Sequence, residues 1–290
     1  LKIRFLYNAT YDYFWALDNI KISGEKTTQQ VLWTPATGLY TDSALTIPYV
    51  ANTFVSTVYA APTTATSYTA KATQGTCEKL VTTASIQRLK KEFRGPGTDW
   101  NTAANWFPAQ VPDNGKCASI PATQTVVINS NAEAKSLTIA ATGKTIVTAG
   151  NSLTVTDAIN ITNNVANDNL VLESDASLLQ INSVIPNSGK LLVKRNVHMR
   201  RLDYTYWSSP VKDQPLLNTA NVNAANSTGG FSEGSPNNRI FQYNESDDKF
   251  YATPDTKFVD AKGYAIRGKS TYDPALLTED TNLKFVGIPN

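Results

Sequence analysis

The feature that most constrains the fold is a series of short apolar pairs whose members are two residues apart. A period of two places both members of a pair on the same face of a β-strand. Windows of ~11 residues with the i, i+3, i+4, i+7 apolar spacing of an amphipathic helix do not occur. The sequence therefore predicts an all-β protein. The pairs are Val126/Ile128, Leu137/Ile139, Leu153/Val155, Ile159/Ile161, Leu170/Leu172, Leu179/Ile181 and Leu191/Val193.

These pairs recur at a nearly constant interval. Leu137 and Leu153 are 153 − 137 = 16 residues apart, and Leu153 and Leu170 are 170 − 153 = 17 residues apart. Glycine and asparagine residues between the pairs supply turns. An irregular repeat of this kind is typical of a β-solenoid, in which each rung buries the next. An ordinary β-meander is the alternative for residues 99–200.

The whole chain is expected to hold tandem β modules. Residues 1–24 contain two strand-like pieces, as at the end of a sandwich whose start is missing. Residues 25–87 carry strand-like runs with turn signals every ~8–12 residues, which predicts a small Ig-like sandwich anchored by a tryptophan. Residues 88–98 contain Arg-Gly-Pro-Gly and predict a linker. The aromatic-rich residues 201–290 predict a second β-sandwich, incomplete at the end of the chain.

Several local expectations follow. Trp33 should be a core anchor of the Ig-like module, and Tyr68 should lie on a late central strand. RIFQYNESDDKFYA predicts a hairpin with its loop at Asn244–Asp248, and KGYAIRG predicts another strand. Neither end of the chain has the features of a natural terminus, so a segment of a longer protein is expected.

Composition excludes several classes of function. Lys and Arg number 26 against 24 Asp and Glu, a net charge of +2 without a basic stripe, so nucleic acid is not expected as a partner. Apolar runs fall short of the ~18–20 residues of a membrane span, so the chain is expected not to span a membrane. Cys77 and Cys117 fit either one disulfide or two small buried thiols.

One motif suggests a nucleophile. Gly230–Gly234 matches G-x-S-x-G, with Ser232 at the nucleophile position. That motif requires a strand before it, a helix after it and a downstream histidine, yet it lies between loop-like segments and the single histidine, His198, is upstream. One histidine also excludes most His-based metal sites. The sequence therefore predicts a protein that is not an enzyme.

Acidic pairs are the remaining candidates for chemistry. Asp247/Asp248 and Glu279/Asp280 both fall in predicted loops, so they are interpreted as solvated turn acids rather than as the two carboxylates of a glycosidase. Asp247, Asp248 and Asp255 could instead help to hold a structural calcium ion through oxygen ligands. No other cofactor is expected.

The stretch DWNTAANWFPAQVPDNG, residues 99–115, has two interpretations. Exposed aromatic side chains stack on sugar rings, and the best placed for glycan contact are Trp100, Trp106, Tyr206 and Trp207. A tryptophan beside Asn-Trp-Phe-Pro is more often a buried plug. The second interpretation is favoured, with Trp100 and Trp106 filling the first turns of the β module.

The order of motifs carries a family resemblance. WTPATGLYTD is followed by YAAPTTATSYTAKATQGTC, TDWNTAANWFPAQVPDNGKCASIPA, KSLTIAATGKTIVTAGNSLTV and YTYWSSPV. This order resembles the region near the C-terminus of the giant gliding-motility adhesins, large cell-surface proteins that Bacteroidota export through the type IX secretion system. The resemblance covers roughly residues 25–275. Similar modules decorate secreted hydrolases and other surface proteins.

The resemblance implies an extracellular protein attached to the outer membrane. Its partners would be the type IX translocon, an outer-membrane anchoring protein and surface polysaccharide. WTPATGLYTD resembles an Ig-like repeat, and FWALDNIKIS resembles the last strand of a jelly-roll domain, here truncated. The triplet Asp42-Ser43-Ala44 fits the O-glycosylation signal of such bacteria and assigns the modification to Ser43.

The resulting hypothesis is a non-enzymatic stalk and adhesive segment of a large surface adhesin, used in attachment and gliding motility. The alternative is a non-catalytic, carbohydrate-binding accessory region of a secreted polysaccharide-degrading enzyme.

Overall fold

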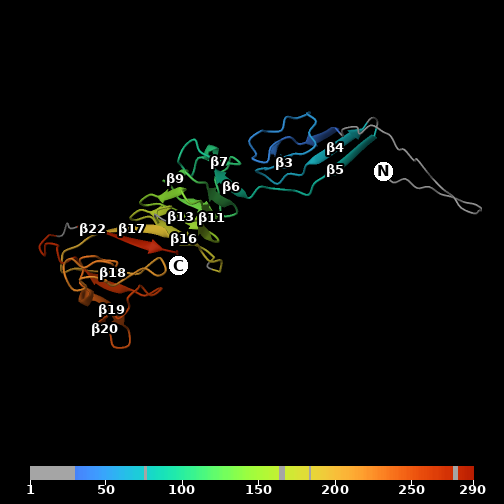
Figure 1. The fold of residues 1–290 in the computed structure, drawn as a ribbon. Coiled ribbons are helices and arrows are strands. Elements are labelled where there is room, and N and C mark those ends of the chain that lie inside the picture. Colours follow the sequence, from blue (N-terminus) through green and yellow to red (C-terminus); the bar gives the residue numbers. More distant parts are fainter. Residues whose placement is uncertain (1–29, 75–76, 163–166, 183, 277–279) are drawn as a thin grey trace, which may run out of the picture. The chain divides into compact units, whose positions relative to one another are not determined.

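A computed structural model gives the fold, which is all-β (Figure 1). Its only helices among the described residues are two 3-10 turns, Ala103–Asn105 and Asn237–Arg239. No described helix has the length and apolarity needed to cross a membrane. The strands expected at residues 1–24 lie outside the described part. The structure describes residues 30–74, 77–162, 167–182, 184–276 and 280–290.

The described chain falls into two compact units, of which the second holds Ala60–Thr66 and Ser85–Asn290. The first unit is built on an antiparallel sheet in the order β1-β4-β5. A short two-stranded sheet, β2-β3, accompanies it. The bounds are β1 Gln30–Thr34, β2 Leu39–Tyr40, β3 Tyr59–Ala60, β4 Thr69–Gln74 and β5 Cys77–Thr82.

Two aromatic residues organise the small core of the first unit. Tyr68 is buried beside Leu39, and its hydroxyl donates a hydrogen bond to the carbonyl oxygen of Thr37 at 2.7 Å. Trp33 is partly buried against this cluster and donates its indole N–H to the carbonyl oxygen of Val55 at 2.9 Å. Trp33 therefore contributes to the core as expected, and Tyr68 directly precedes β4.

The second unit contains a β-solenoid made of three parallel sheets. We call them sheet I, sheet II and sheet III, in the order in which the chain visits them on each rung. Sheet I contains β8, β11 and β14; sheet II contains β9, β12, β15 and β17; sheet III contains β10, β13 and β16. The bounds are β8 Cys117–Ile120, β9 Thr125–Ile128, β10 Ala132–Ala134, β11 Leu137–Ile139, β12 Lys144–Val147, β13 Ser152–Val155, β14 Ile159–Ile161, β15 Leu170–Leu172, β16 Ser177–Gln180 and β17 Leu191–His198.

Strand register confirms the solenoid and rejects the meander, but it corrects the repeat. In sheet I, Ala118 pairs with Leu137, which pairs with Ile159, so the rungs are 137 − 118 = 19 and 159 − 137 = 22 residues long. Leu137, Leu153 and Leu170 lie in sheets I, III and II respectively. The intervals of 16 and 17 residues therefore connect strands of different sheets and are wrong as a rung length.

Most of the predicted apolar pairs point into the solenoid, as their period of two requires. Leu179 and Ile181 are the exception, because they are 54% and 62% exposed. The register of β16 turns Leu178 and Gln180 inward instead. The members of this pair share a face, but it is the outer one.

The linker predicted at residues 88–98 is wrong. Lys90–Phe93 form β6, which runs parallel to β8 and antiparallel to β7 (Trp106–Phe107), so sheet I begins here. Lys91 and Phe93 both point inward and are fully buried. A lysine at an inward position breaks the apolar alternation that would have marked the strand.

The C-terminal segment forms an antiparallel sheet in the order β18-β21-β19-β20. The predicted hairpin is confirmed as the pair β19 and β20, and the strand predicted in KGYAIRG is β21. The last strand, β22, leaves this sheet and pairs with β17 along its whole length, extending sheet II. The bounds are β18 Tyr204–Trp207, β19 Ile240–Asn244, β20 Lys249–Ala252, β21 Tyr264–Arg267 and β22 Asp280–Gly287.

Residues 201–290 are therefore not the separate second sandwich that was expected. The ring of Phe285, on β22, lies 4.3 Å from the ring of Phe231 and 6.1 Å from that of Trp207, measured between centroids. These residues belong to one continuous core with the solenoid residues from Phe93 onward. The four-stranded sheet is thus attached to the solenoid through shared side-chain packing.

Candidate functional site

Two of the four tryptophan and tyrosine residues predicted to contact glycan are inaccessible. Trp100 is 0% exposed and Trp106 is 2% exposed. A sugar ring cannot stack on either, so the glycan-contact prediction is wrong for both residues. The favoured interpretation, a plug in the first turns of the module, is confirmed.

The plug is held together by ring packing and one buried hydrogen bond. The centroid of the Trp106 ring lies 4.8 Å from that of Trp100 and 5.2 Å from that of Phe93, both in edge-to-face geometry. Trp106 donates its indole N–H to the carbonyl oxygen of Trp100 at 2.7 Å. These rings cover the first rung of the solenoid and leave no surface for a ligand.

A different aromatic surface lies on the outer face of the four-stranded sheet. On β18, Tyr204 and Tyr206 point outward, whereas Thr205 and Trp207 point toward the core. Tyr206 is 72% exposed. Trp207 packs against Phe231 and donates its indole N–H to Thr205 Oγ1 at 2.7 Å. The prediction of glycan contact therefore fails for Trp207 and remains open for Tyr206.

Strands β19 and β20 of the same sheet extend this surface. Phe241 and Tyr243 of β19 pair with Ala252 and Phe250 of β20, so all four side chains share the outward face. We call the five outward aromatic side chains, Tyr204, Tyr206, Phe241, Tyr243 and Phe250, the aromatic face. Ring centroids are separated by 5.8 Å for Tyr204–Phe241, 6.2 Å for Tyr206–Phe250 and 5.2 Å for Tyr243–Phe250.

A small residue at the centre of the sheet makes this face concave. Ala265 of β21 lies between Tyr206 and Phe241 in the register, and its methyl group leaves room between the larger rings. Two adjoining hollows of about 280 Å³ and 560 Å³ result, both lined by Tyr206, Phe250 and Ala265. The second is also lined by Glu245 and Lys262.

Carboxylates at the tip of the hairpin fix two tyrosine hydroxyls. Tyr243 donates its hydroxyl to Asp248, and Tyr251 donates its hydroxyl to Asp247. Each hydrogen bond favours the neutral phenol and raises the pKa of its tyrosine above the ordinary value of 10.0. The Tyr243 ring is thereby held in position as a neutral platform.

The acidic residues considered for calcium are engaged in other contacts. Asp255 accepts hydrogen bonds from Lys262 Nζ at 2.6 Å and from the Tyr264 hydroxyl at 2.7 Å. The Lys262 bond is the main cause of a lowered pKa for Asp255. Within the residues that the structure describes, no three acidic, histidine or cysteine side chains gather as a metal site would require. Asp247, Asp248 and Asp255 therefore do not form the shared site considered for them.

The serine of the G-x-S-x-G match is a structural residue. Ser232 is 3% exposed, and its hydroxyl lies 2.8 Å from that of Ser235, which donates to the carbonyl oxygen of Arg267. His198 lies on β17 opposite Asp280 of β22. Glu279 lies outside the described residues, so the pair Glu279/Asp280 is only half described.

The remaining predicted positions are distributed over both units. Ser43 is exposed in a turn, where the adjacent Asp42 carboxylate accepts hydrogen bonds from the backbone N–H groups of Thr46 and Ile47. Cys77 and Cys117 carry free thiols. None of these three residues belongs to the aromatic face.

Sequence reasoning found one of the five residues of the aromatic face as a site candidate. It missed Tyr204, Phe241, Tyr243 and Phe250. The signal was present as alternation, since Tyr204 and Tyr206 are two apart, as are Phe241 and Tyr243. What alternation does not give is the strand order that places β18 and β20 in the same sheet.

Comparison with known proteins yields one match. A family model described as Domain of unknown function (DUF8693) matches residues 93–290, which is more than half of the chain. The matched region runs from the end of β6 to the last residue, so it includes the solenoid and the aromatic face. No curated protein and no solved structure matches the chain. The chain belongs to the DUF8693 family.

Proposed function

We propose that this chain is a non-enzymatic binding and spacer segment of an extracellular surface protein, and that the aromatic face is its carbohydrate-contacting surface. The observation that carries the proposal is the aromatic face itself: five outward aromatic side chains gathered on one sheet beside two hollows. Large contiguous apolar patches on a soluble protein commonly mark a binding surface.

The chemistry of the aromatic face suits a sugar better than a purely apolar ligand. The flat faces of Tyr206 and Phe250 offer apolar contact to the C–H groups of a pyranose ring, and tyrosine adds a polar rim. Glu245 borders the second hollow and offers a carboxylate that can accept hydrogen bonds from sugar hydroxyls. A shallow, mixed surface of this kind favours a polysaccharide chain over a small apolar molecule.

The solenoid supports a role as spacer. Its rungs stack with fully buried aliphatic side chains, and β22 joins the aromatic sheet to it through the shared core. A load applied to the aromatic sheet would pass into the solenoid along β17 and β22, whose eight residue pairs run antiparallel. Such a continuous body would transmit force without a flexible joint at this point.

The identity of the larger protein is proposed from the motif resemblance. A gliding-motility adhesin of Bacteroidota would be exported by the type IX secretion system and held by an outer-membrane anchoring protein at the cell surface. The alternative, a carbohydrate-binding accessory region of a secreted polysaccharide-degrading enzyme, would use the same aromatic face. The two proposals differ in where the protein is found.

Glycan binding tests the site. The protein should retain a set of glycans on an array or an insoluble polysaccharide, and the double variant Tyr206→Ala/Phe250→Ala should lose them by roughly tenfold or more. Phe54→Ala is the matched control, because Phe54 is an exposed aromatic residue of the first unit. Equal retention by the wild type and the double variant would refute the assignment of the site.

Localisation tests the larger context. An antibody against residues 201–290 should label foci that stay on living source cells and travel along them if the protein is a motility adhesin. Static foci would favour a surface protein without a role in gliding. A signal confined to the medium would refute the adhesin proposal and favour the accessory region of a secreted enzyme.

A further inference from the structure

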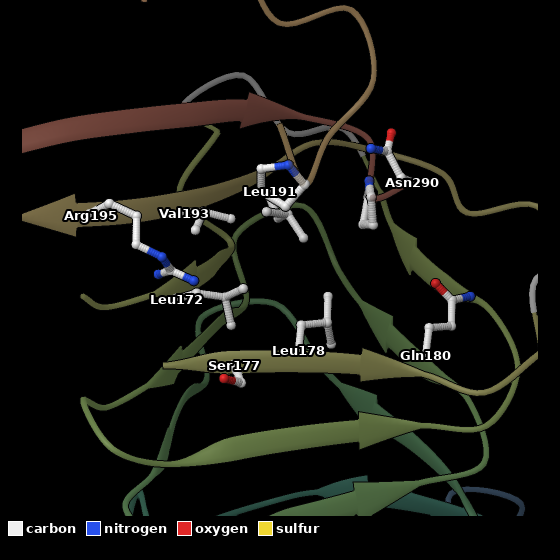
Figure 2. A pocket seen from close by; sticks show the side chains of 10 residues that line it. Leu172, Ser177, Leu178, Gln180, Leu191, Val193, Arg195 and Asn290 are labelled. Atoms are coloured by element: carbon white, nitrogen blue, oxygen red, sulfur yellow. The ribbon is translucent and has the colours of Figure 1, made fainter. Parts of the chain in front are cut away.

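The far end of the solenoid leaves one strand edge open. The edge of β14 in sheet I is covered by a parallel bridge between Asn160 and Ser188, and sheet II continues through β17 to β22. Among the strands that the structure describes, sheet III ends at β16. A pocket of about 300 Å³ lies beside β16, where a further strand of sheet III would continue the stack (Figure 2). The open edge and the pocket therefore occur at the same place.

The lining of this pocket mixes apolar with polar side chains, and its single charged side chain is basic. Leu172, Leu178, Leu191 and Val193 line it from β15, β16 and β17, and Figure 2 shows the guanidinium of Arg195 turned toward them. No aspartate or glutamate lines the pocket. The lining thus combines hydrophobic contact with one positive charge.

The guanidinium of Arg195 has unused hydrogen-bonding capacity. Nη1 donates to the carbonyl oxygens of Glu173 at 3.3 Å and Lys194 at 2.8 Å, and Nη2 donates to that of Ala176 at 3.0 Å. Three of the five N–H groups of an arginine are therefore occupied, all by neutral acceptors. The Glu173 carboxylate is paired with Lys194 Nζ at 2.7 Å. The Asp175 carboxylate attracts the guanidinium electrostatically but does not line the pocket. A carboxylate that enters the pocket would therefore be the first to bond to Arg195 from inside it.

The backbone of β16 is also available on its open side. Ser177 and Ile181 donate their N–H groups to Asn151 and Val155 of the neighbouring rung, each at 3.0 Å. Alternate residues of a parallel strand direct their backbone groups to opposite neighbours. Leu178 and Gln180 therefore direct theirs to the open edge, which is the arrangement that accepts an added strand.

We propose that this edge binds an extended peptide segment that adds a strand to β16 and places an acidic side chain on Arg195. Side chains two positions apart on the added strand would both face the pocket. One would be the aspartate or glutamate that meets the guanidinium, and the other an apolar residue against Leu178 and Val193. This site is separate from the aromatic face and does not depend on its function.

Amide exchange in the full chain is the first test. The probe is a blocked nine-residue peptide of alternating valine and threonine with one central glutamate at an inward position; the matched peptide carries glutamine there. Addition of the glutamate peptide should slow hydrogen exchange at the amides of Leu178 and Gln180. The amide of Leu179 is the internal control, since the alternation directs it to β13. Unchanged exchange at Leu178 and Gln180 at saturating peptide would overturn the proposal.

Binding affinity is the second test. By fluorescence polarisation, the glutamate peptide should bind roughly tenfold more tightly than the glutamine peptide, the gain expected of one charge-assisted pair. Arg195→Gln should remove this difference, whereas Lys194→Gln, which removes the neighbouring charge, should keep it. Equal affinities of the two peptides for the wild type would refute the acidic preference. Butyrate binding as tightly as the glutamate peptide would refute strand addition, because the carboxylate alone would then account for affinity.

Discussion

At the residue scale, the buried indoles of Trp100 and Trp106 close the first rung of the solenoid. Their edge-to-face packing with Phe93 fills space that the parallel strands alone leave open. The indole N–H of Trp106 donates a hydrogen bond to the backbone carbonyl oxygen of Trp100, and this bond fixes the backbone at Trp100. A tryptophan in a turn-rich segment is here a folding element.

Replacing Trp106 by alanine should destabilise the second unit by about 3–5 kcal/mol, because a large buried ring and a buried hydrogen bond are lost together. Urea unfolding followed by circular dichroism measures the change. Tyr206→Ala is the control, since its exposed ring should contribute within about 1 kcal/mol. A loss below about 1 kcal/mol for Trp106→Ala would contradict the plug.

Lys91 is a second residue whose role depends on burial. Its side chain is fully buried, and its Nζ has no hydrogen-bond partner in the part of the chain that the structure describes. Desolvation lowers the pKa of this amine below 10.5. The folded state therefore binds the proton less readily than the unfolded state does, which costs stability at neutral pH.

Lys91→Met should stabilise the protein at pH 7 by about 1 kcal/mol or more, because an apolar side chain of similar length removes the burial penalty. The gain should shrink as the pH rises toward 10.5, where the unfolded lysine also loses its proton. Chemical unfolding at pH 7 and pH 10 measures both values. Lys90→Met, at the exposed neighbouring position, is the control. A destabilised Lys91→Met protein at pH 7 would show that the amine is needed.

At the element scale, the solenoid depends on tight turns that connect its strands, and these turns differ in length. Gly189 has φ +77°, and a Cβ there would lie 2.3 Å from the carbonyl oxygen of Ile161. Gly150 has the same φ of +77° but open space around its Cβ position. The two glycines therefore separate the cost of backbone conformation from the cost of a close contact.

Gly150→Ala should cost about 1 kcal/mol, the penalty of a positive φ for a residue with a Cβ. Gly189→Ala should cost at least about 2 kcal/mol more, because the methyl group would also displace the β14 backbone. Thermal unfolding of the two variants under identical conditions gives the comparison. Equal losses would mean that the corner at Gly189 has room to move.

Much of the element pattern could be read from the sequence, and its limits have physical causes. Period-two pairs marked seven of the ten described strands in the three solenoid sheets, because most of these strands bury alternate side chains. They missed β8, β10 and β12, where alanine or threonine occupies inward positions. The rung length could not be predicted from the sequence, because the turns between consecutive strands differ in length. In addition, an apolar pair does not reveal to which of the three sheets its strand belongs. β6 was missed because Lys91 occupies a core position. The aromatic face was missed because strand order, which alternation does not encode, brings Tyr206 and Phe250 together.

At the scale of the whole molecule, β22 joins two parts of the second unit. Phe285 packs against Trp207, Phe231 and Phe258 on one side of the strand pair. Its own strand continues sheet II of the solenoid. The aromatic sheet and the solenoid should therefore unfold as one cooperative body.

Phe285→Ala should lower the free energy of unfolding of the solenoid and of the aromatic sheet equally, by about 3–5 kcal/mol, because the two share the core in which Phe285 is buried. Native-state hydrogen exchange measures the loss of protection at backbone amides of β12 in the solenoid and of β21 in the aromatic sheet. The two should lose protection by the same amount. A loss confined to β21 would show that the aromatic sheet opens independently of the solenoid.

Contact between the aromatic face and carbohydrate can be observed at the tyrosine rings themselves. Carbon-13 ring resonances of the full chain would be recorded while an array-selected glycan is added. The resonances of Tyr204, Tyr206 and Tyr243 should shift together and saturably, whereas those of the buried rings of Tyr49, Tyr68 and Tyr264 should not change. Saturable shifts elsewhere in the chain, with the rings of the aromatic face unmoved, would contradict this contact.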